Sequence, residues 1–250
     1  MSKTSILGID IDDIDKGGLE RAIVDCAEGG TKEVFAYVNV NAINIAQSNP
    51  EFRRFLNSAH VAYCDGEGIR LGARILGIAP PPRTVLTRTI WDLGALFQER
   101  GLSVFLLGGR RESAAAAASR WCDRYPKLRL VGYHDGYFEK TGPQNNEVIG
   151  SINRQCPNVL FVGFGMPEQE LWIQRNIEQL QVNAVIPCGG MVDYLSGEAE
   201  VAPEWMSDYG MEWMHRLFQD PARLWERYLL GNPRFFFRIL QELLNRGRGS

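Results

Sequence analysis

The chain has 250 residues, of which 45% are hydrophobic and 23% are charged, values typical of a globular protein with a sizeable core. No run reaches the roughly 18 apolar residues that cross a bilayer, and we expect no signal peptide because the first apolar run is short. Five cysteines without a CxxC pair favour free thiols in the cytoplasm over a disulfide framework. The net charge of −3 is uneven, because residues 211–250 hold seven Arg against four acidic residues. This basic end indicates an anionic partner, with a solvated, ion-paired helix as the common alternative.

In chain order, short apolar runs alternate with helical patterns through the first 200 residues. The predicted strands are Ser5–Asp10, Val34–Val40, Val61–Cys64, Val104–Leu107, Leu128–Gly132, Val159–Val162 and Ala184–Pro187. The predicted helices lie near residues 17–28, 42–57, 67–76, 87–100, 111–124, 144–155, 168–180 and 203–217. This alternation is typical of βαβ units, so we expect an α/β fold with a Rossmann-like, mostly parallel sheet covered by helices on both faces.

The character of the sequence changes after about residue 200. From Trp205 onward it is rich in Trp, Phe, Leu and Arg and shows no further strand pattern. We therefore predict an α/β domain over residues 1–200 and a helical C-terminal appendage over residues 201–250.

Three predicted strands end in glycine-rich turns that lead into helices. Such turns direct free backbone N–H groups and the positive end of a helix dipole at a ligand, and phosphate suits them. The glycines are Gly108 and Gly109, Gly163 and Gly165, and Gly189 and Gly190. Pro167, in the second turn, fits the start of a helix. Each turn alone is ordinary, and neither a full GxGxxG nor a Walker A sequence is present, but the three together predict a nucleotide-type pocket.

Polar side chains follow other strand ends. Asn39 and Asn41 can bond a sugar or a base, or can form an Asx turn. Asp65, which comes directly after an apolar strand and precedes a glycine, can act as a general base or belong to an Asp-Gly turn. Arg83 leaves a proline-rich loop before a helix, where it suits a diphosphate or lies on the surface beside a helix cap. Ligands of parallel sheets bind at the carboxyl ends of strands, where all these residues are expected.

Metal ligation is poorly supported. The three histidines, His60, His134 and His215, are far apart in sequence. The segment Asp10–Asp13 contains an Asp-x-Asp pattern among its three carboxylates, but it lies at the end of the first predicted strand, and we interpret it as a turn and helix cap. We expect neither a metal nor another cofactor.

The ordered set of motifs resembles the WecG/TagA/CpsF family of bacterial glycosyltransferases over roughly residues 5–230. Besides the residues above, the resemblance rests on Phe105–Gly109, the run Gly163–Glu170, Gly189–Asp193, Ala202–Met206 and Gly210–Leu217. The resemblance implies an inverting, metal-independent transferase that moves a sugar from a UDP-sugar to a polyprenyl-diphosphate-linked sugar in surface polysaccharide biosynthesis. In this family a Thr often occupies the position of Asn39, which leaves the identity of the sugars open.

The resemblance also implies residue roles. The expected catalytic residues are Asp65, Asn39, Arg83 and Gln169. Asp65 is the expected base, and Arg83 and Gln169 are expected to hold the diphosphate of the donor. Asn41 and Asp193 are expected to bind the nucleoside. The remaining residues expected to bind the UDP-sugar are Gly108, Gly109, Gly163, Gly165, Pro167, Glu170, Gly189 and Gly190.

For the appendage, the resemblance implies contact with the inner face of the cytoplasmic membrane and with the lipid diphosphate. Arg216, Arg223 and Arg227 are the expected contacts with the diphosphate or with anionic lipid head groups. Trp213, Trp225 and the run Phe235–Phe237 are expected either to enter the membrane interface or to pack within a helical subdomain. We expect a peripheral cytoplasmic protein without a nucleic-acid partner, and homo-oligomer formation stays open.

Two other functions compete with the transferase. A nucleotide-sugar epimerase or dehydrogenase would normally carry GxGxxG after the first strand, which this chain lacks. A non-catalytic, membrane-associated scaffold that binds nucleotide-sugar would rely on the arginine-rich, aromatic C-terminal part. The donor sugar, whether N-acetylmannosamine, its uronic acid or glucose, is not specified by the sequence, nor are the acceptor sugar and linkage.

Overall fold

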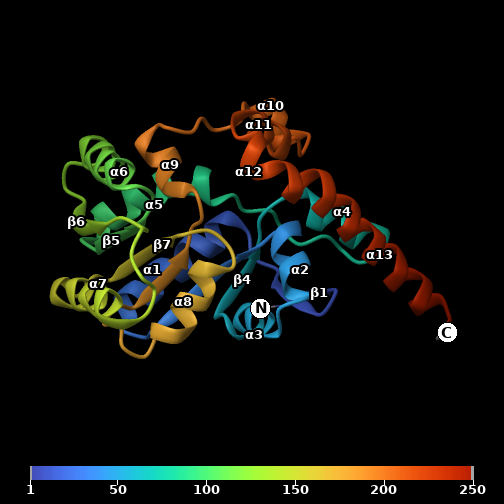
Figure 1. Cartoon of the computed structure of the whole chain (residues 1–250), viewed down its shortest axis with the longest axis horizontal. Helices are drawn as coiled ribbons and strands as arrows, with labels where there is room; N and C mark the ends of the chain where they lie inside the picture. Colours follow the sequence, from blue (N-terminus) through green and yellow to red (C-terminus); the bar gives the residue numbers. More distant parts are fainter. Residues whose placement is uncertain (1, 249–250) are drawn as a thin grey trace. The chain divides into compact units, whose positions relative to one another are not determined.

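The computed structural model describes residues 2–248 (Figure 1). The chain forms two compact units, of which the first takes in residues 1–16, 37–85 and 201–250 and the second residues 17–36 and 86–200. The boundary expected near residue 200 coincides with the start of the last segment of the first unit, which also includes two earlier parts of the chain.

The central element is a six-stranded parallel sheet with strand order β4-β3-β8-β7-β5-β6, which confirms the predicted fold class. Its strands are β3 (Glu33–Val38), β4 (Val61–Cys64), β5 (Ser103–Gly108), β6 (Arg129–His134), β7 (Val159–Gly163) and β8 (Ala184–Pro187). Strands β5, β7 and β8 are buried along their whole length, and this explains why they appear in the sequence as continuous apolar runs.

In the second unit, helices cover both faces of the sheet (Figure 1). One face carries α5 (Leu86–Arg100), α6 (Arg111–Arg124) and α9 (Met191–Ser196), and the other carries α7 (Gly142–Gln155) and α8 (Glu168–Asn176). The helix α1 (Lys16–Gly29) precedes β3. Trp121 of α6 packs edge-on against Phe161 of β7, with ring centroids 5.8 Å apart, and forms part of a dry core.

The N-terminal segment differs from the prediction. Instead of one strand over Ser5–Asp10, it forms an antiparallel hairpin of β1 (Lys3–Ile6) and β2 (Ile9–Asp12). Leu7 and Gly8 both have positive φ, 50° and 75°, as a two-residue hairpin turn requires. The interpretation of Asp10–Asp13 as a helix cap is therefore wrong for Asp12, whose buried carboxylate accepts the N–H of Ala62 at 2.8 Å.

The predicted helix over residues 42–57 is in fact two helices, α2 (Val40–Ala46) and α3 (Pro50–Ser58). The break occurs because Pro50 cannot continue a helix but fits the first position of a new one, which Asn49 caps by accepting the N–H of Phe52. The helix α4 (Glu67–Ile75) follows β4.

From residue 204 to residue 248 the C-terminal part consists of helices joined by short connections. It contains α10 (Glu204–Asp208), α11 (Glu212–Gln219), α12 (Pro221–Trp225), a π-helical turn (Glu226–Leu230) and α13 (Gly231–Arg248). The predicted helix over residues 203–217 is thus interrupted, at Gly210, whose φ is +70°. Within residues 2–248, no helix combines the length and the apolar character needed to span a membrane.

Helix α13 packs along α2 and α4 in the first unit (Figure 1). Phe235 and Ile239 are fully buried there, and Gly72 of α4 lies directly beneath both side chains. Asn44 of α2 forms two hydrogen bonds with α13: its amide donates to the carbonyl of Gly231 at 2.8 Å and accepts from Arg238 at 2.7 Å. Both packing and hydrogen bonds therefore anchor α13 to the first unit.

Candidate functional site

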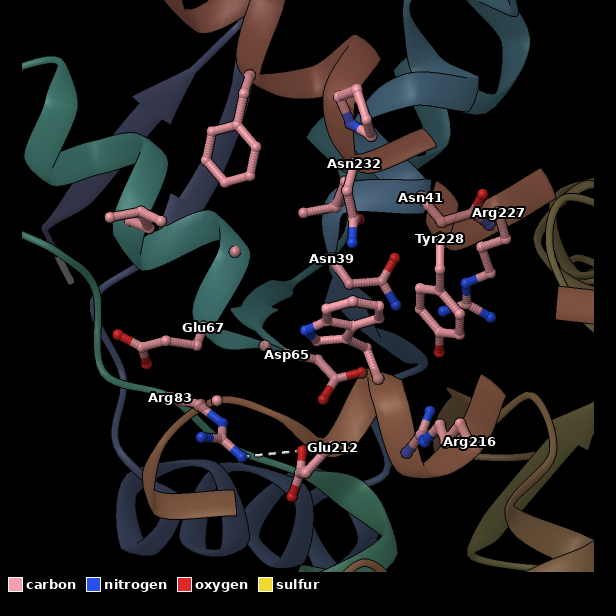
Figure 2. Close-up of a pocket in the computed structure, with 18 of the residues that line it drawn as sticks. Asn39, Asn41, Asp65, Glu67, Arg83, Glu212, Arg216, Arg227, Tyr228 and Asn232 are labelled. Atoms are coloured by element: carbon pink, nitrogen blue, oxygen red, sulfur yellow. Dashed lines mark ion pairs between the residues drawn. The ribbon is translucent and has the colours of Figure 1, made fainter. Parts of the chain in front are cut away.

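A pocket of about 490 Å³ lies within the first unit (Figure 2). Its wall is formed by the end of β3 and start of α2, the turn from β4 into α4, and Arg83. The opposite wall comes from the α10–α11 connection, α11, the π-helical turn and the start of α13. The pocket thus combines polar strand ends with an arginine-rich and aromatic helical region.

Asp65 lies in the depth of this pocket (Figure 2). Its backbone N–H donates to the carbonyl of Val38 at 2.8 Å, and this bond fixes the turn that follows β4. Burial raises the pKa of the Asp65 carboxyl above its ordinary value, and the charge of Glu212 adds to the rise. Arg216, and more weakly Arg227 and Arg83, oppose it. A carboxyl whose pKa is raised in this way is a stronger base than an ordinary aspartate.

Arg83 lies beside the end of β4. Thr84, which follows it, donates its backbone N–H to the carbonyl of Cys64 at 2.9 Å. The guanidinium of Arg83 contacts Glu212 at 2.9 Å and both the carbonyl and the hydroxyl of Ser207 at 2.8 Å. The hydroxyl of Ser207 in turn donates to Glu212 at 2.6 Å. A phosphate that binds to Arg83 must therefore compete with Glu212 for the guanidinium.

The two asparagines after β3 occupy different environments. Asn39 is buried and caps α2, with its side-chain oxygen accepting the N–H of Ala42 at 3.0 Å. The Asx-type alternative is thus confirmed for Asn39, which also lines the pocket through the rest of its amide. Asn41 lies in the first turn of α2 and lines the pocket as well.

The structure separates the three arginines that were grouped in the sequence. Arg216 and Arg227 line the pocket, whereas Arg223 is 68% exposed and pairs with Asp220 at 2.7 Å. Trp213 also lines the pocket, and its ring lies 5.8 Å from that of Tyr228.

The run Phe235–Phe237 does not act as one interfacial patch. Phe235 is fully buried beneath α13, so its expected place in a membrane interface is wrong and the packing alternative holds. Phe237 is 61% exposed. The difference follows from the helical period, since residues two positions apart on a helix point to different faces.

The three glycine junctions lie together in the second unit, at the ends of the neighbouring strands β5, β7 and β8. Gly109 donates its N–H to the carbonyl of Gly163 at 3.3 Å. A side chain at Gly108 would lie 2.4 Å from the carbonyl oxygen of Gly163, and one at Gly163 would lie 2.6 Å from that of Gly189. Glycine is therefore required at both positions for the backbones to approach this closely.

The residues after the second junction include two buried side chains. Gln169 is 0% exposed and Glu170 is 1% exposed, so both lie behind the turn instead of on its ligand side. Pro167 precedes α8 and follows a cis peptide bond. Gly190 and Asp193 open α9, where the N–H of Asp193 donates to the carbonyl of Gly190 at 3.1 Å.

Several residues at these sites carried no recognisable signal in the sequence. In the pocket they are Tyr228 and Asn232, and outside its lining Ser207 bonds to Arg83. Glu212 lies within the run Gly210–Leu217 that carries the resemblance, but no role was assigned to it. Beside Phe164 in the second unit, the ammonium of Lys140 lies 4.2 Å from the ring centroid. These residues contact segments that are distant in the sequence, and no local sequence pattern predicts such contacts. Within residues 2–248, no three His, Cys, Asp or Glu side chains group so that they could hold a metal ion.

Comparison with known proteins identifies related chains. The model of the glycosyl transferase WecG/TagA/CpsF family matches residues 4–249. A protein of Bacillus subtilis (strain 168) named N-acetylglucosaminyldiphosphoundecaprenol N-acetyl-beta-D-mannosaminyltransferase is 28% identical over 91% of this chain and 86% of its own length. A protein of the same name from Bacillus spizizenii (strain ATCC 23059 / NRRL B-14472 / W23) is 28% identical over 78% of this chain and 74% of its own.

Proposed function

Because the chain belongs to the WecG/TagA/CpsF family of glycosyltransferases, we propose that it moves a sugar from a UDP-sugar to a polyprenyl-diphosphate-linked acceptor. The names of the two Bacillus relatives support N-acetylmannosamine as the transferred sugar and N-acetylglucosaminyldiphosphoundecaprenol as the acceptor. The observation that carries the proposal is the pocket in which Asp65 faces Arg216 and Arg227.

In this proposal Asp65 is the general base. It removes the proton from the acceptor hydroxyl, whose oxygen attacks the anomeric carbon as the bond to UDP breaks, so that the configuration inverts. The raised pKa of Asp65 supports the role, because a stronger base takes the proton more readily. The protonated carboxyl then releases its proton to solvent.

We assign the diphosphate of the acceptor lipid to Arg216 and Arg227. Both arginines line the same pocket as Asp65, and a guanidinium binds phosphate oxygens with paired N–H donors. The apolar part of the same wall, which includes Leu71, Leu229 and Phe236, suits the first isoprene units of the lipid. Arg223, which points away from the pocket, is assigned no contact with the diphosphate.

We assign the UDP part of the donor to the glycine junctions and to Asp193 in the second unit. The glycine turns after β5, β7 and β8 support diphosphate binding because they let a ligand approach the backbone closely, and the carboxylate of Asp193 suits a ribose hydroxyl or a uracil N–H. The positive ends of the helices that follow these turns offset the charge of the leaving UDP in this proposal, which assigns no role to a metal.

The test is release of UDP from a panel of UDP-sugars, measured with and without a polyprenyl-diphosphate-linked N-acetylglucosamine and in the presence of EDTA. We expect acceptor-dependent release from UDP-N-acetylmannosamine that survives EDTA. Release from another UDP-sugar alone would replace the assigned donor, and release only with added divalent metal would overturn the metal-independent mechanism. Absence of both turnover and UDP binding in folded protein would overturn the proposed function.

A further inference from the structure

The side chain of Gln169 connects two glycine junctions that are about twenty residues apart in the sequence. Its Oε1 accepts the N–H of Gly165, after β7, at 3.2 Å and the N–H of Gly189, after β8, at 3.0 Å. The backbone N–H of Gln169 donates to the carbonyl of Gly165 at 3.1 Å, so this glycine is held on both sides. The amide of Gln169 therefore sets the spacing between the two turns.

This arrangement determines which way the amide faces. Only the oxygen of a carboxamide accepts hydrogen bonds, so two backbone donors require Oε1 on the side of the turns. The Nε2 group must then point inward, where it donates to Oε1 of Glu170 at 2.7 Å. The flipped amide would set two N–H donors against Nε2 and an oxygen against a carboxyl oxygen.

Glu170 is a buried carboxyl in the first turn of α8. It is 1% exposed, and its Oε2 has no hydrogen-bond partner among the residues that the structure describes. A buried carboxyl with one oxygen unsatisfied costs free energy, which an apolar side chain of similar volume would avoid. Its other oxygen, Oε1, accepts from the amide that joins the turns.

We infer that Glu170 is a positioning residue that fixes the orientation of the Gln169 amide and thereby holds the two glycine junctions at the spacing the donor diphosphate needs. The tolerance is narrow, because a carbon atom added at Gly163 would already lie 2.6 Å from the carbonyl oxygen of Gly189. The identity of the ligand rests on the proposed function, whereas the connection between the turns does not.

The test exchanges the hydrogen-bond donor and acceptor between positions 169 and 170. In Gln169→Glu, two carboxyl groups face each other, so we expect a donor KM at least tenfold higher at pH 8, with kcat within threefold. In the double variant Gln169→Glu/Glu170→Gln, the carboxylate at position 169 accepts both N–H groups and the new amide donates to it. We expect the double variant to reverse at least half of the rise in donor KM, measured on a logarithmic scale.

Amide hydrogen exchange provides a readout that needs no substrate. Peptides covering residues 163–170 and 187–193 should exchange at least tenfold faster in Gln169→Glu and in Glu170→Met than in the wild-type protein, and should regain protection in the double variant. Glu170→Met should raise the donor KM more than Glu170→Gln does, because glutamine keeps an acceptor for Nε2. A double variant as unprotected as Gln169→Glu would overturn the inference.

Asn158 supplies a matched control at the other end of β7. Its amide also connects distant segments, accepting from the N–H of Ser103 at 2.8 Å and donating to the carbonyl of Ala27 at 3.2 Å. Asn158→Ala should lower stability and leave the donor KM within twofold. An equal rise in KM in this variant would mean that general destabilisation explains the effect and would overturn the inference. If the wild-type enzyme turned over no UDP-sugar, the proposed function would fail while hydrogen exchange still tested the positioning role.

Discussion

At the scale of single residues, the clearest prediction concerns the activity of a variant at Asp65. Asp65→Asn keeps the shape of the side chain and removes its capacity to take up a proton, so kcat should fall by about 10²–10⁴-fold, the usual contribution of a general base. UDP release at saturating acceptor measures kcat, and titration calorimetry with UDP should give an affinity within about threefold of wild type. Turnover close to that of the wild-type enzyme would contradict the assignment.

Glu170 predicts how stability changes with pH. Burial raises the pKa of its carboxyl from 4.5 to about 7, with the Gln169 hydrogen bond opposing, so the folded protein holds this proton more tightly than the unfolded chain. Its contribution is therefore present below pH 4.5 and is lost as the pH rises to about 7, at a cost of about 3 kcal/mol. Urea unfolding of wild type and Glu170→Gln should show the wild type losing about that much more stability between pH 4.5 and 8. Parallel pH dependence of the two proteins would contradict it.

The sequence located these residues better than it described their orientation. Position after an apolar strand was enough to single out Asp65, whereas the family resemblance was needed to single out Gln169. The direction of a side chain depends on contacts from distant segments, however. Asp65 faces a pocket built in part by α11, whereas Gln169 faces inward because two turn N–H groups require its oxygen.

At the scale of elements, Gly72 determines how α13 docks on α4. A carbon atom at this position would lie 2.8 Å from the ring of Phe235 and 3.3 Å from Ile239. Gly72→Val should therefore displace α13 and lower the free energy of unfolding by about 1–3 kcal/mol, despite the better helix propensity of valine than glycine. Protease sensitivity within residues 231–246 and urea unfolding would measure the two effects.

Gly150 of α7 is the control for that substitution. A methyl group added at Gly150 would have as its nearest neighbour the end of the flexible Arg154 side chain, 3.5 Å away. Gly150→Ala should therefore stabilise the protein by up to about 1 kcal/mol, because alanine loses less conformational freedom in a helix than glycine does. Stabilisation by Gly72→Val as well would show that α13 does not pack as described.

The elements that the sequence predicted well are those with a strong local pattern. Strands β5, β7 and β8 are continuous apolar runs, and each glycine junction follows one of them. The errors occurred where one residue changes the local outcome: Gly8 turns the first strand into a hairpin, and Pro50 divides the second helix. In both cases the apolar or helical pattern continues on either side of that residue, so the sequence was interpreted as one uninterrupted element.

At the scale of the whole molecule, the motif order identified the family, and the match over residues 4–249 confirms it. Motif order could not predict the composition of the two compact units. The first unit joins three segments separated by up to about a hundred residues, and such long-range assembly leaves little trace in local patterns. The pocket in that unit consequently contains both residues that the sequence selected, such as Asp65, and residues that it did not, such as Tyr228.

The exposed face of the C-terminal helix leads us to predict that it binds a membrane surface. Phe237, Leu240 and Leu244 are 61%, 51% and 64% exposed and follow one another at helical spacing along α13. Exposed arginines of the same helix, Arg234 and Arg246, would favour anionic head groups beside this apolar stripe. Replacing the three apolar residues with Ser should reduce binding to phosphatidylglycerol-containing vesicles by at least tenfold.

The expected loss of vesicle binding follows from the apolar surface area that the membrane covers. Each large apolar side chain contributes about 1.5–3 kcal/mol when it is fully buried, and a part of that when it lies at a membrane interface. UDP affinity should stay within twofold, since none of the three residues belongs to the glycine junctions or to the pocket. Tyr137, which is 76% exposed in the second unit, provides the control, and Tyr137→Ser should leave vesicle sedimentation unchanged. Equal losses in both variants would mean that vesicle binding reports general surface hydrophobicity, and no loss in the triple variant would exclude α13 as the membrane contact.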